Sequence, residues 1–158
     1  MISDVLRSAW SRLIHSGKTY LYDLEVFALK NMLIFLDGSD RKNFLQQLNK
    51  LDLVQRSPDG KIVALYESRD AYFKFWGDIL LTNKMGGFLA YKIKLTGDVC
   101  PKKNLTVEVF FHKGRISSIE YKGKMAWPKT QKKVRLVNLD WSVCDDGALT
   151  IISSELLL

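Results

Sequence analysis

The sequence has few of the residues that most often carry catalysis and metal binding. It contains two histidines, His15 and His112, and two cysteines, Cys100 and Cys144. The histidines fall at a predicted helix end and in a predicted hairpin turn. A histidine-based triad, acid–base pair or metal site would need them to converge with carboxylates. No phosphate-binding glycine loop, nucleophile elbow or H-E-x-x-H motif is present. We therefore expect no enzyme active site, no metal site and no cofactor.

Long apolar runs and metal-type cysteine spacings are also missing. The two cysteines lie far apart, as is typical of reduced thiols in the cytoplasm. No apolar stretch reaches the length of a transmembrane helix. The first ten residues include Asp4 and lack the apolar core of a signal peptide. Adjacent Asp145 and Asp146 offer too few oxygen ligands for a divalent cation. These features predict a cytoplasmic protein with no membrane span.

Acidic residues are scarce in one segment. Residues 84–140 hold 13 Lys and Arg and four acids, a net charge of +9, whereas the whole chain carries +7. Residues 1–83, with eleven basic and ten acidic side chains, sum to +1, and residues 141–158 sum to −3. The positive charge therefore belongs to one segment. If these side chains share a face, their field favours an acidic partner.

The first half of the chain has helical periodicity. It predicts helices over 2–15, 20–36 and 40–50, with Ser39 as the N-cap of the third. The second predicted helix carries an apolar face, and the third is expected to bury three residues. These two sets are Leu24, Phe27, Ala28, Asn31, Ile34 and Phe35, and Phe44, Leu45 and Leu48. A hairpin follows, with strands over 53–55 and 62–66 joined by the turn 57–60.

The second half alternates as strands do. Strands are predicted over 88–97, 105–111, 115–122, 133–140 and 148–156, whereas residues 70–82 have no clear period. A three-residue loop of His112, Lys113 and Gly114, with Gly114 left-handed, would align Leu105 with Tyr121 and Val107 with Ile119. A two-residue loop would place Glu108 opposite Ile119, so we prefer the longer one.

These elements predict an α+β fold, with an N-terminal helical layer packed on a C-terminal antiparallel sheet. We expect one domain over residues 1–158. Possible sub-lobes span 1–83 and 88–158, with Gly86-Gly87 as the joint between them.

The basic residues form three groups in the predicted sheet. One lies on the outward face of a strand, one at both ends of a hairpin, and one beside a tryptophan. They are Lys92 and Lys94; Lys113, Arg115, Lys122 and Lys124; and Trp127, Lys129, Lys132, Lys133 and Arg135. They either keep a sheet face and its edges soluble or form an electrostatic docking surface. Phe110 and Trp127 are the aromatic residues best placed to stack on bases.

Residues 21–66 also have the element order of a winged helix. The would-be recognition helix offers Arg41, Lys42, Asn43, Gln46, Gln47 and Lys50. However, this stretch holds six basic and six acidic residues, so it lacks the net positive charge that dominates DNA affinity.

Residues 44–48, 53–61 and 107–120 resemble small immunity proteins that neutralise bacterial polymorphic toxins, including those of contact-dependent growth inhibition. The likeness covers about a fifth of the chain, mainly a strand, a glycine turn and a second strand ending Ile119-Glu120. It implies a cytoplasmic protein that occludes a toxin domain and carries no catalytic residues. Immunity proteins against nuclease toxins are commonly acidic, whereas this chain is basic.

The sequence therefore predicts a binding protein for an acidic protein partner, possibly a cognate toxin domain. The partner-binding residues would be the three basic groups named above. The main alternative is a nucleic-acid-binding module that uses the same basic sheet face, and an enzyme is the third.

Overall fold

A computed structural model describes residues 18–67, 79–97, 100–122, 132–136, 139–141 and 149–158, and it has the expected α+β layout. The N-terminal part contains β1 (Tyr20–Tyr22), α2 (Asp23–Phe35), α3 (Gly38–Lys50), β2 (Leu53–Arg56) and β3 (Ile62–Tyr66). The C-terminal part contains β4 (Phe88–Gly97), β5 (Cys100–His112), β6 (Arg115–Lys122), β7 (Lys133–Arg135) and β8 (Leu149–Leu156). Neither described helix is long and apolar enough to cross a membrane.

Six strands form one antiparallel sheet in the order β2-β3-β6-β5-β4-β8, and β1 pairs with β7 in a separate two-stranded sheet. The large sheet draws on both halves of the sequence, because β3 pairs with β6. It therefore crosses the Gly86-Gly87 joint, and β4 begins directly after that joint.

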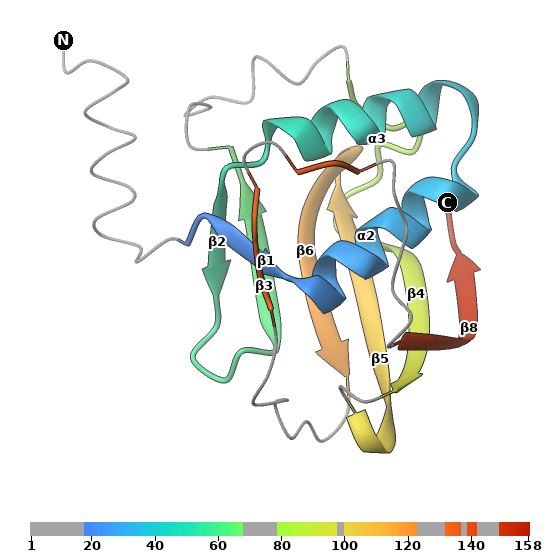
Figure 1. The fold of residues 1–158 in the computed structure, drawn as a ribbon. Helices are drawn as coiled ribbons and strands as arrows, with labels where there is room; N and C mark the ends of the chain where they lie inside the picture. The colour runs from blue at the N-terminus through green and yellow to red at the C-terminus, as the bar shows by residue number, and fades with distance from the viewer. Residues whose placement is uncertain (1–17, 68–78, 98–99, 123–131, 137–138, 142–148) are drawn as a thin grey trace, which may run out of the picture.

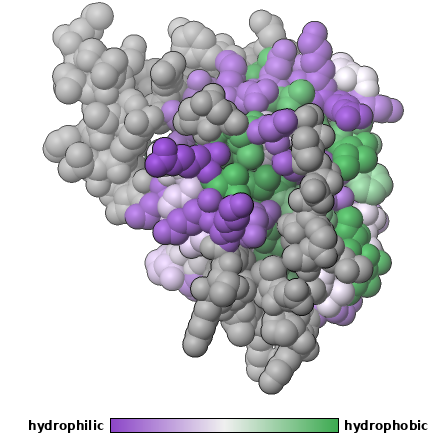
Figure 2. Space-filling model, viewed as in Figure 1, coloured by the Kyte–Doolittle hydropathy of each residue, from purple (hydrophilic) through white to green (hydrophobic). Residues whose placement is uncertain are grey.

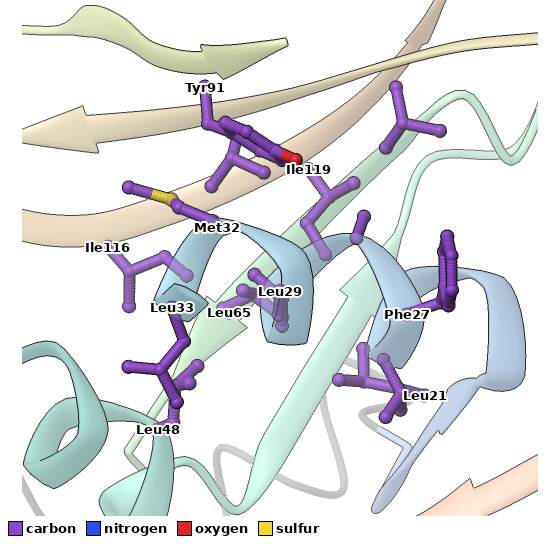
Figure 3. Close-up of a cluster of buried hydrophobic side chains, with 14 of the residues drawn as sticks. Leu21, Phe27, Leu29, Met32, Leu33, Leu48, Leu65, Tyr91, Ile116 and Ile119 are labelled. Carbon is purple, nitrogen blue, oxygen red and sulfur yellow. The ribbon is translucent and has the colours of Figure 1, made fainter. Parts of the chain in front are cut away.

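Helices α2 and α3 lie on one face of the large sheet (Figure 1). Side chains from both helices and from the sheet form one buried apolar cluster (Figure 3). Leu29 and Met32 of α2, Leu48 of α3, and Leu65 and Ile119 of the sheet are all 2% exposed or less. The helical layer therefore covers one face of the sheet and leaves the other for polar residues.

The predicted helix over 20–36 begins three residues later than expected. Residues 20–22 form β1 because their backbone pairs with β7, and the Asp23 N–H donates to the carbonyl of Lys132. At the start of α2, the Glu25 carboxylate accepts the Tyr22 N–H at 2.8 Å, which satisfies a backbone donor that the helix leaves free. The expected buried face of this helix is partly wrong, since Ile34 and Phe35 are at least half exposed.

The expected start and apolar face of α3 also need correction. The helix begins at Gly38 after the N-cap Asp37, so the predicted N-cap Ser39 is wrong. Phe44 is buried as expected, but Leu45 is exposed and the polar Gln47 is fully buried in its place. The reason is tertiary, because Gln47 finds hydrogen-bond partners outside its own helix.

The β2–β3 hairpin is confirmed. The Gly60 N–H donates to the Ser57 carbonyl at 2.8 Å, and Gly60 has φ +72°. The Asp59 carboxylate accepts bonds from the Ser57 hydroxyl and the Lys61 N–H. These two hydrogen bonds, that of Ser57 first, lower the pKa of Asp59. The turn over 57–60 and the left-handed Gly60 are therefore as predicted, and the hydrogen bonds of Asp59 are an addition from the structure.

The β5–β6 hairpin has a shorter loop than expected. His112 faces Arg115, so the loop is the two residues Lys113 and Gly114, with φ +51° and +78°. Positive φ at both loop residues is typical of a type I′ turn, whose twist matches that of the strands. The left-handed Gly114 is confirmed, and the three-residue loop is wrong.

A β-bulge explains why the expected register failed. Phe110 faces Ser118 while Phe111 faces Ile116, so Ser117 is an extra residue on β6. The extra residue shifts the pairing by one and brings apolar residues back into line. The expected pairs are wrong: Val107 faces Tyr121, and Val109 faces Ile119.

The other strands follow their alternation to different extents. The alternation in β4 predicts Leu89, Tyr91, Ile93 and Leu95 on the buried face and Ala90, Lys92, Lys94 and Thr96 on the outward face. Tyr91, Ile93 and Leu95 are buried and Lys92 is exposed, as predicted, but Ala90 is fully buried and Leu89 only partly, because the pairing with β5 shifts between Leu89 and Tyr91. The strand predicted over 133–140 is shorter, because β7 ends at Arg135. The strand predicted over 148–156 matches β8, which pairs with β4. The predicted helix over 2–15 and the turn over 144–147 lie outside the described residues.

Candidate docking surface

The described basic residues of the three predicted groups lie in three separate places. Lys92 and Lys94 on β4 and Lys122 on β6 lie on the two strands that flank β5, whereas Lys113 and Arg115 lie in and directly after the β5–β6 turn. Lys132, Lys133 and Arg135 belong to β7 and the residue before it. Lys124, Trp127 and Lys129 lie outside the described residues. The fold therefore does not gather the described basic residues into one patch.

The lysines on the sheet alternate with glutamates. Lys92 Nζ lies 3.6 Å from a Glu108 oxygen, and Lys122 Nζ lies 3.7 Å from Glu108 and 2.9 Å from Glu120. The hydrogen bond to Glu120 is the first cause of the raised pKa of Lys122. Glu155 of β8 also faces Lys92. This part of the sheet therefore has little net charge, and its positive field is weak.

The basic residues at the hairpin tip lie in, or directly after, a turn that packs against the protein. The Lys113 N–H donates to the Met85 carbonyl at 2.7 Å, and Gly114 is buried. A Cβ added to Gly114 would lie 2.9 Å from the Leu81 carbonyl oxygen. The Lys113 side chain is exposed, but it stands apart from the other basic groups along the sheet.

The two-stranded sheet combines cations with aromatic rings. Tyr20 faces Arg135 and Tyr22 faces Lys133 across β1 and β7, and the Lys133 ammonium lies 4.9 Å from the centre of the Tyr20 ring. Lys132, Lys133 and Arg135 are exposed, and the described residues give none of them a carboxylate within ion-pair distance. We call Tyr20, Tyr22, Lys132, Lys133 and Arg135 the cationic ribbon.

A buried ion pair packs against one tyrosine of the cationic ribbon. Glu25 is fully buried, and its carboxylate binds both terminal nitrogens of the Arg56 guanidinium, with Nη2 2.7 Å from Oε2. The Tyr121 hydroxyl donates to Glu25 Oε1 at 2.8 Å. The guanidinium then lies 4.3 Å from the centre of the Tyr22 ring. The pair therefore packs against the Tyr22 ring and fixes its position. Because Glu25 neutralises Arg56, the pair adds little to the positive field at the surface.

Burial and the partners of Glu25 change two pKa values here. Burial opposes the charge of Arg56, but the hydrogen bonds and charge of Glu25 outweigh it and raise the pKa of the guanidinium. Burial, followed by the charge and hydrogen bond of Glu25, raises the pKa of Tyr121 well above its ordinary value. Both groups therefore keep their protons over the whole physiological range.

Sequence reasoning placed Lys132, Lys133 and Arg135 among the candidates but missed Tyr20, Tyr22 and Arg56. The sequence signal for the two tyrosines was the alternation in Tyr20-Leu21-Tyr22. In the structure, Leu21 is buried and the tyrosines on either side are half-buried. This three-residue pattern is short, and the helical period that follows it obscured the strand.

Helix α3, which would be the recognition helix of a winged helix, makes hydrogen bonds within the protein through two of its polar side chains. The Asn43 amide donates to the Leu80 carbonyl, and Gln47 is fully buried with three hydrogen bonds. A helix that reads DNA presents these positions to base edges. The geometry of α3 therefore does not favour DNA reading by this element.

The described residues contain no group of three or more His, Cys, Asp or Glu that could hold a metal ion. Comparisons of the whole chain with protein families, characterised proteins and solved structures find no match.

Proposed function

We propose that this protein is a cytoplasmic binding protein that docks an acidic protein on the cationic ribbon. Its partner would be the toxin domain that it neutralises as a bacterial immunity protein. The observation that carries the proposal is the contrast between two sets of cations. Lys92 and Lys122 on the sheet have glutamate partners, whereas the three cations of the ribbon have none among the described residues. An acidic partner would supply the missing charges.

The aromatic residues of the ribbon fit a protein partner. Tyr20 and Tyr22 are half-buried, with ring centres 5.7 Å apart, and the Arg56–Glu25 pair holds the second ring. Rigid tyrosines give a large contact area and lose little conformational entropy on binding. The cations would then steer the partner and speed association, while the tyrosines would supply the apolar contact.

The test is the kinetics of association with the toxin domain encoded by the neighbouring reading frame. A variant with Lys132, Lys133 and Arg135 all changed to serine should fold normally. We expect its association rate constant at low salt to fall by about tenfold, with a weaker dependence on salt. The matched control changes Lys92, Lys94 and Lys122 to serine and should alter the rate by less than about twofold, because those lysines share their face with glutamates. Equal effects of the two variants would contradict the proposal.

Nucleic acid is the second candidate, and the pairing of tyrosines with basic residues in the ribbon favours it. Exposed aromatic rings beside cations can stack on bases while the cations bind phosphates. Under the proposal, random-sequence RNA should not bind at about 0.15 M salt, the physiological ionic strength. Submicromolar binding that the ribbon variant abolishes would replace the acidic protein with nucleic acid.

A further inference from the structure

The two edges of the large sheet differ. The backbone of Lys18 covers part of the outer edge of β2, since its N–H and carbonyl bond the carbonyl and N–H of Val54 at 2.8 and 2.7 Å. At the opposite end of the sheet, β8 pairs with β4 on one side, and the described residues supply no strand on its other side. Within the part of the chain that the structure describes, one edge of β8 is therefore unpaired and can accept a further strand.

The open edge is apolar at both ends and lacks the lysines and prolines that usually guard a sheet edge. Residues 149–158 contain no Lys, Arg or Pro, and their single charge is that of Glu155. Four residues here, Ile151, Ile152, Leu157 and Leu158, are 39–46% exposed. Exposed Ile34 and Phe35 lie at the end of α2, and the Phe35 ring contacts Tyr91, which faces Leu156. Figure 2 shows hydrophobic surface gathered along this side of the molecule.

The sequence of this edge has a symmetric hydropathy pattern. Residues 151–157 read Ile-Ile-Ser-Ser-Glu-Leu-Leu, with two apolar residues on each side of a polar centre at Ser154. Ile152 is the extra residue of a β-bulge, since Lys94 faces Ser153 and Leu95 faces Ile151 where β8 pairs with β4. If two such strands run antiparallel with Ser154 opposite Ser154, regular pairing holds from Ser153 to Leu156, and the apolar pair Ile151-Ile152 lies opposite Leu156-Leu157. Apolar side chains then meet apolar side chains at both ends. A second copy of the same strand is thus a matched partner.

The backbone directions agree with this register. The Leu157 N–H donates to the Ala90 carbonyl at 2.8 Å, so it points toward β4. Successive residues of a strand direct these groups to opposite edges. Ser154 lies three positions before Leu157, so its N–H and carbonyl point in the opposite direction, to the open edge. Two copies paired at Ser154 would therefore exchange two backbone hydrogen bonds at the two-fold axis.

Charge favours the same contact. Two copies that each carry +7 repel one another, so they must meet where cations are few. In this register Glu155 faces Ser153 of the second copy, which has Lys94 as its neighbour in β4. Each Glu155 would lie between its own Lys92 and Lys94 of the second copy. The carboxylate that faces the interface thus has a cation on each side.

We propose that this protein forms a two-fold symmetric dimer through antiparallel pairing of β8 with β8 of a second copy, centred on Ser154. The two large sheets become one continuous sheet, and a two-fold interface of this kind uses the same surface on both copies. This dimer is independent of the cationic ribbon and of its partner.

The first test is the mass in solution at tens of micromolar, by sedimentation equilibrium. We expect a dimer that strengthens with added salt, because salt screens the repulsion between two basic copies. Docking on the cationic ribbon would weaken with salt, so the two interactions can be separated. A native chain that stays monomeric at all salt concentrations would overturn the proposal. It would leave the β8 edge to another kind of partner.

The second test uses variants of the central residue. Ser154→Pro removes an N–H that points away from β4, so we expect a monomer with a native circular dichroism spectrum. Ser154→Ala keeps that N–H and should remain dimeric. If the proline variant fails to fold, Leu157→Lys serves instead, since it alters an exposed side chain and retains the bond to Ala90. A dimer that persists in the folded proline or lysine variant would contradict pairing at this edge.

A cross-link tests the register directly. In the proposed pair the two Ser154 Cα atoms are about 5.5 Å apart, within the range that a disulfide can bridge. Ser154→Cys should therefore give a covalent dimer on mild oxidation, above any background of the native chain. Glu155→Cys is the matched control, because its two Cα atoms would be farther apart than a disulfide allows. Equal cross-linking of both variants would exclude this register.

Discussion

The side chain of Gln47 on α3 binds the carbonyl of Gly114 at the tip of the β5–β6 hairpin, with 2.9 Å between Nε2 and the oxygen. The same nitrogen donates to the Ile79 carbonyl at 2.7 Å, and Oε1 accepts the Ile116 N–H at 2.8 Å. Gln47 is fully buried. One amide thus joins the helical layer, the hairpin and the segment that precedes β4.

Replacing Gln47 with leucine should destabilise the protein strongly. The change leaves the Ile116 N–H without its partner in a buried place and removes two bonds to carbonyl oxygens, so we expect a loss of about 3 kcal/mol in the free energy of unfolding. Urea denaturation followed by tryptophan fluorescence measures it. The matched control is Gln46→Leu, because Gln46 is exposed one residue earlier on the same helix. That variant should change stability by less than about 0.5 kcal/mol.

Gly114 should not tolerate even one added carbon. Its φ of +78° is unfavourable for other residues, and a Cβ would lie 2.9 Å from the Leu81 carbonyl oxygen and 3.1 Å from Leu80 Cβ. We expect Gly114→Ala to lower the free energy of unfolding by at least about 1 kcal/mol and to lower the melting temperature. Gly87→Ala is the control, since nothing lies within 4 Å of the added carbon there. Equal melting temperatures for the two variants would show that the hairpin tip is not packed as described.

The Glu25–Arg56 pair should couple strongly. Glu25→Gln removes the charge that balances a largely buried guanidinium, and we expect it to cost about 3 kcal/mol. Replacing both residues with methionine should cost less than the sum of Glu25→Met and Arg56→Met, because neither charge is then left alone. A double-mutant cycle by chemical denaturation measures the coupling. Additive effects would mean that the two residues do not support one another.

Tyr121 should make stability depend on alkaline pH. Its pKa is raised in the folded protein, chiefly by burial and then by Glu25, whereas in the unfolded chain it titrates near 10. The unfolded state therefore loses this proton first. The contribution of Tyr121 to the free energy of unfolding is fully present below pH 10. It is lost as the pH rises from 10 through the raised pKa of the folded state. Tyr121→Phe should be less stable at neutral pH, and its stability should fall less steeply above pH 10. Parallel curves for the two proteins would contradict the shift.

Local patterns in the sequence were sufficient for much of the fold. The helical periods placed α2 and α3 to within three residues, and Pro58 with Gly60 marked the β2–β3 turn because each restricts or permits a particular φ. The alternation in β4 identified Tyr91 and Ile93 as buried and Lys92 as exposed. These features depend on residues close together in the chain, so they are readable without the rest of the protein.

The candidate surface was predictable only in part. The basic residues of β7 were identified by charge, but their separation from the sheet lysines depends on the pairing of β7 with β1. Tyr20 and Tyr22 were missed because a three-residue strand has too short a pattern to stand out against the helix that follows. Glu108, which lies near both Lys92 and Lys122, comes from β5, and only the register of β5 with β4 and β6 places it between them.

The sequence alone determined the class of the fold, the turn at Ser57–Gly60 and the location of the positive charge, since all three follow from local composition and period. The tertiary structure alone decided the strand order, the bulge at Ser117 and the burial of Gln47 and Glu25. The physical reason is that each of these features is unfavourable locally and is stabilised by residues that are distant in the sequence. An extra residue in a strand or a polar side chain in the core is unfavourable by itself. It becomes stable only when strands and helices far away in the sequence supply matching hydrogen bonds and apolar contacts.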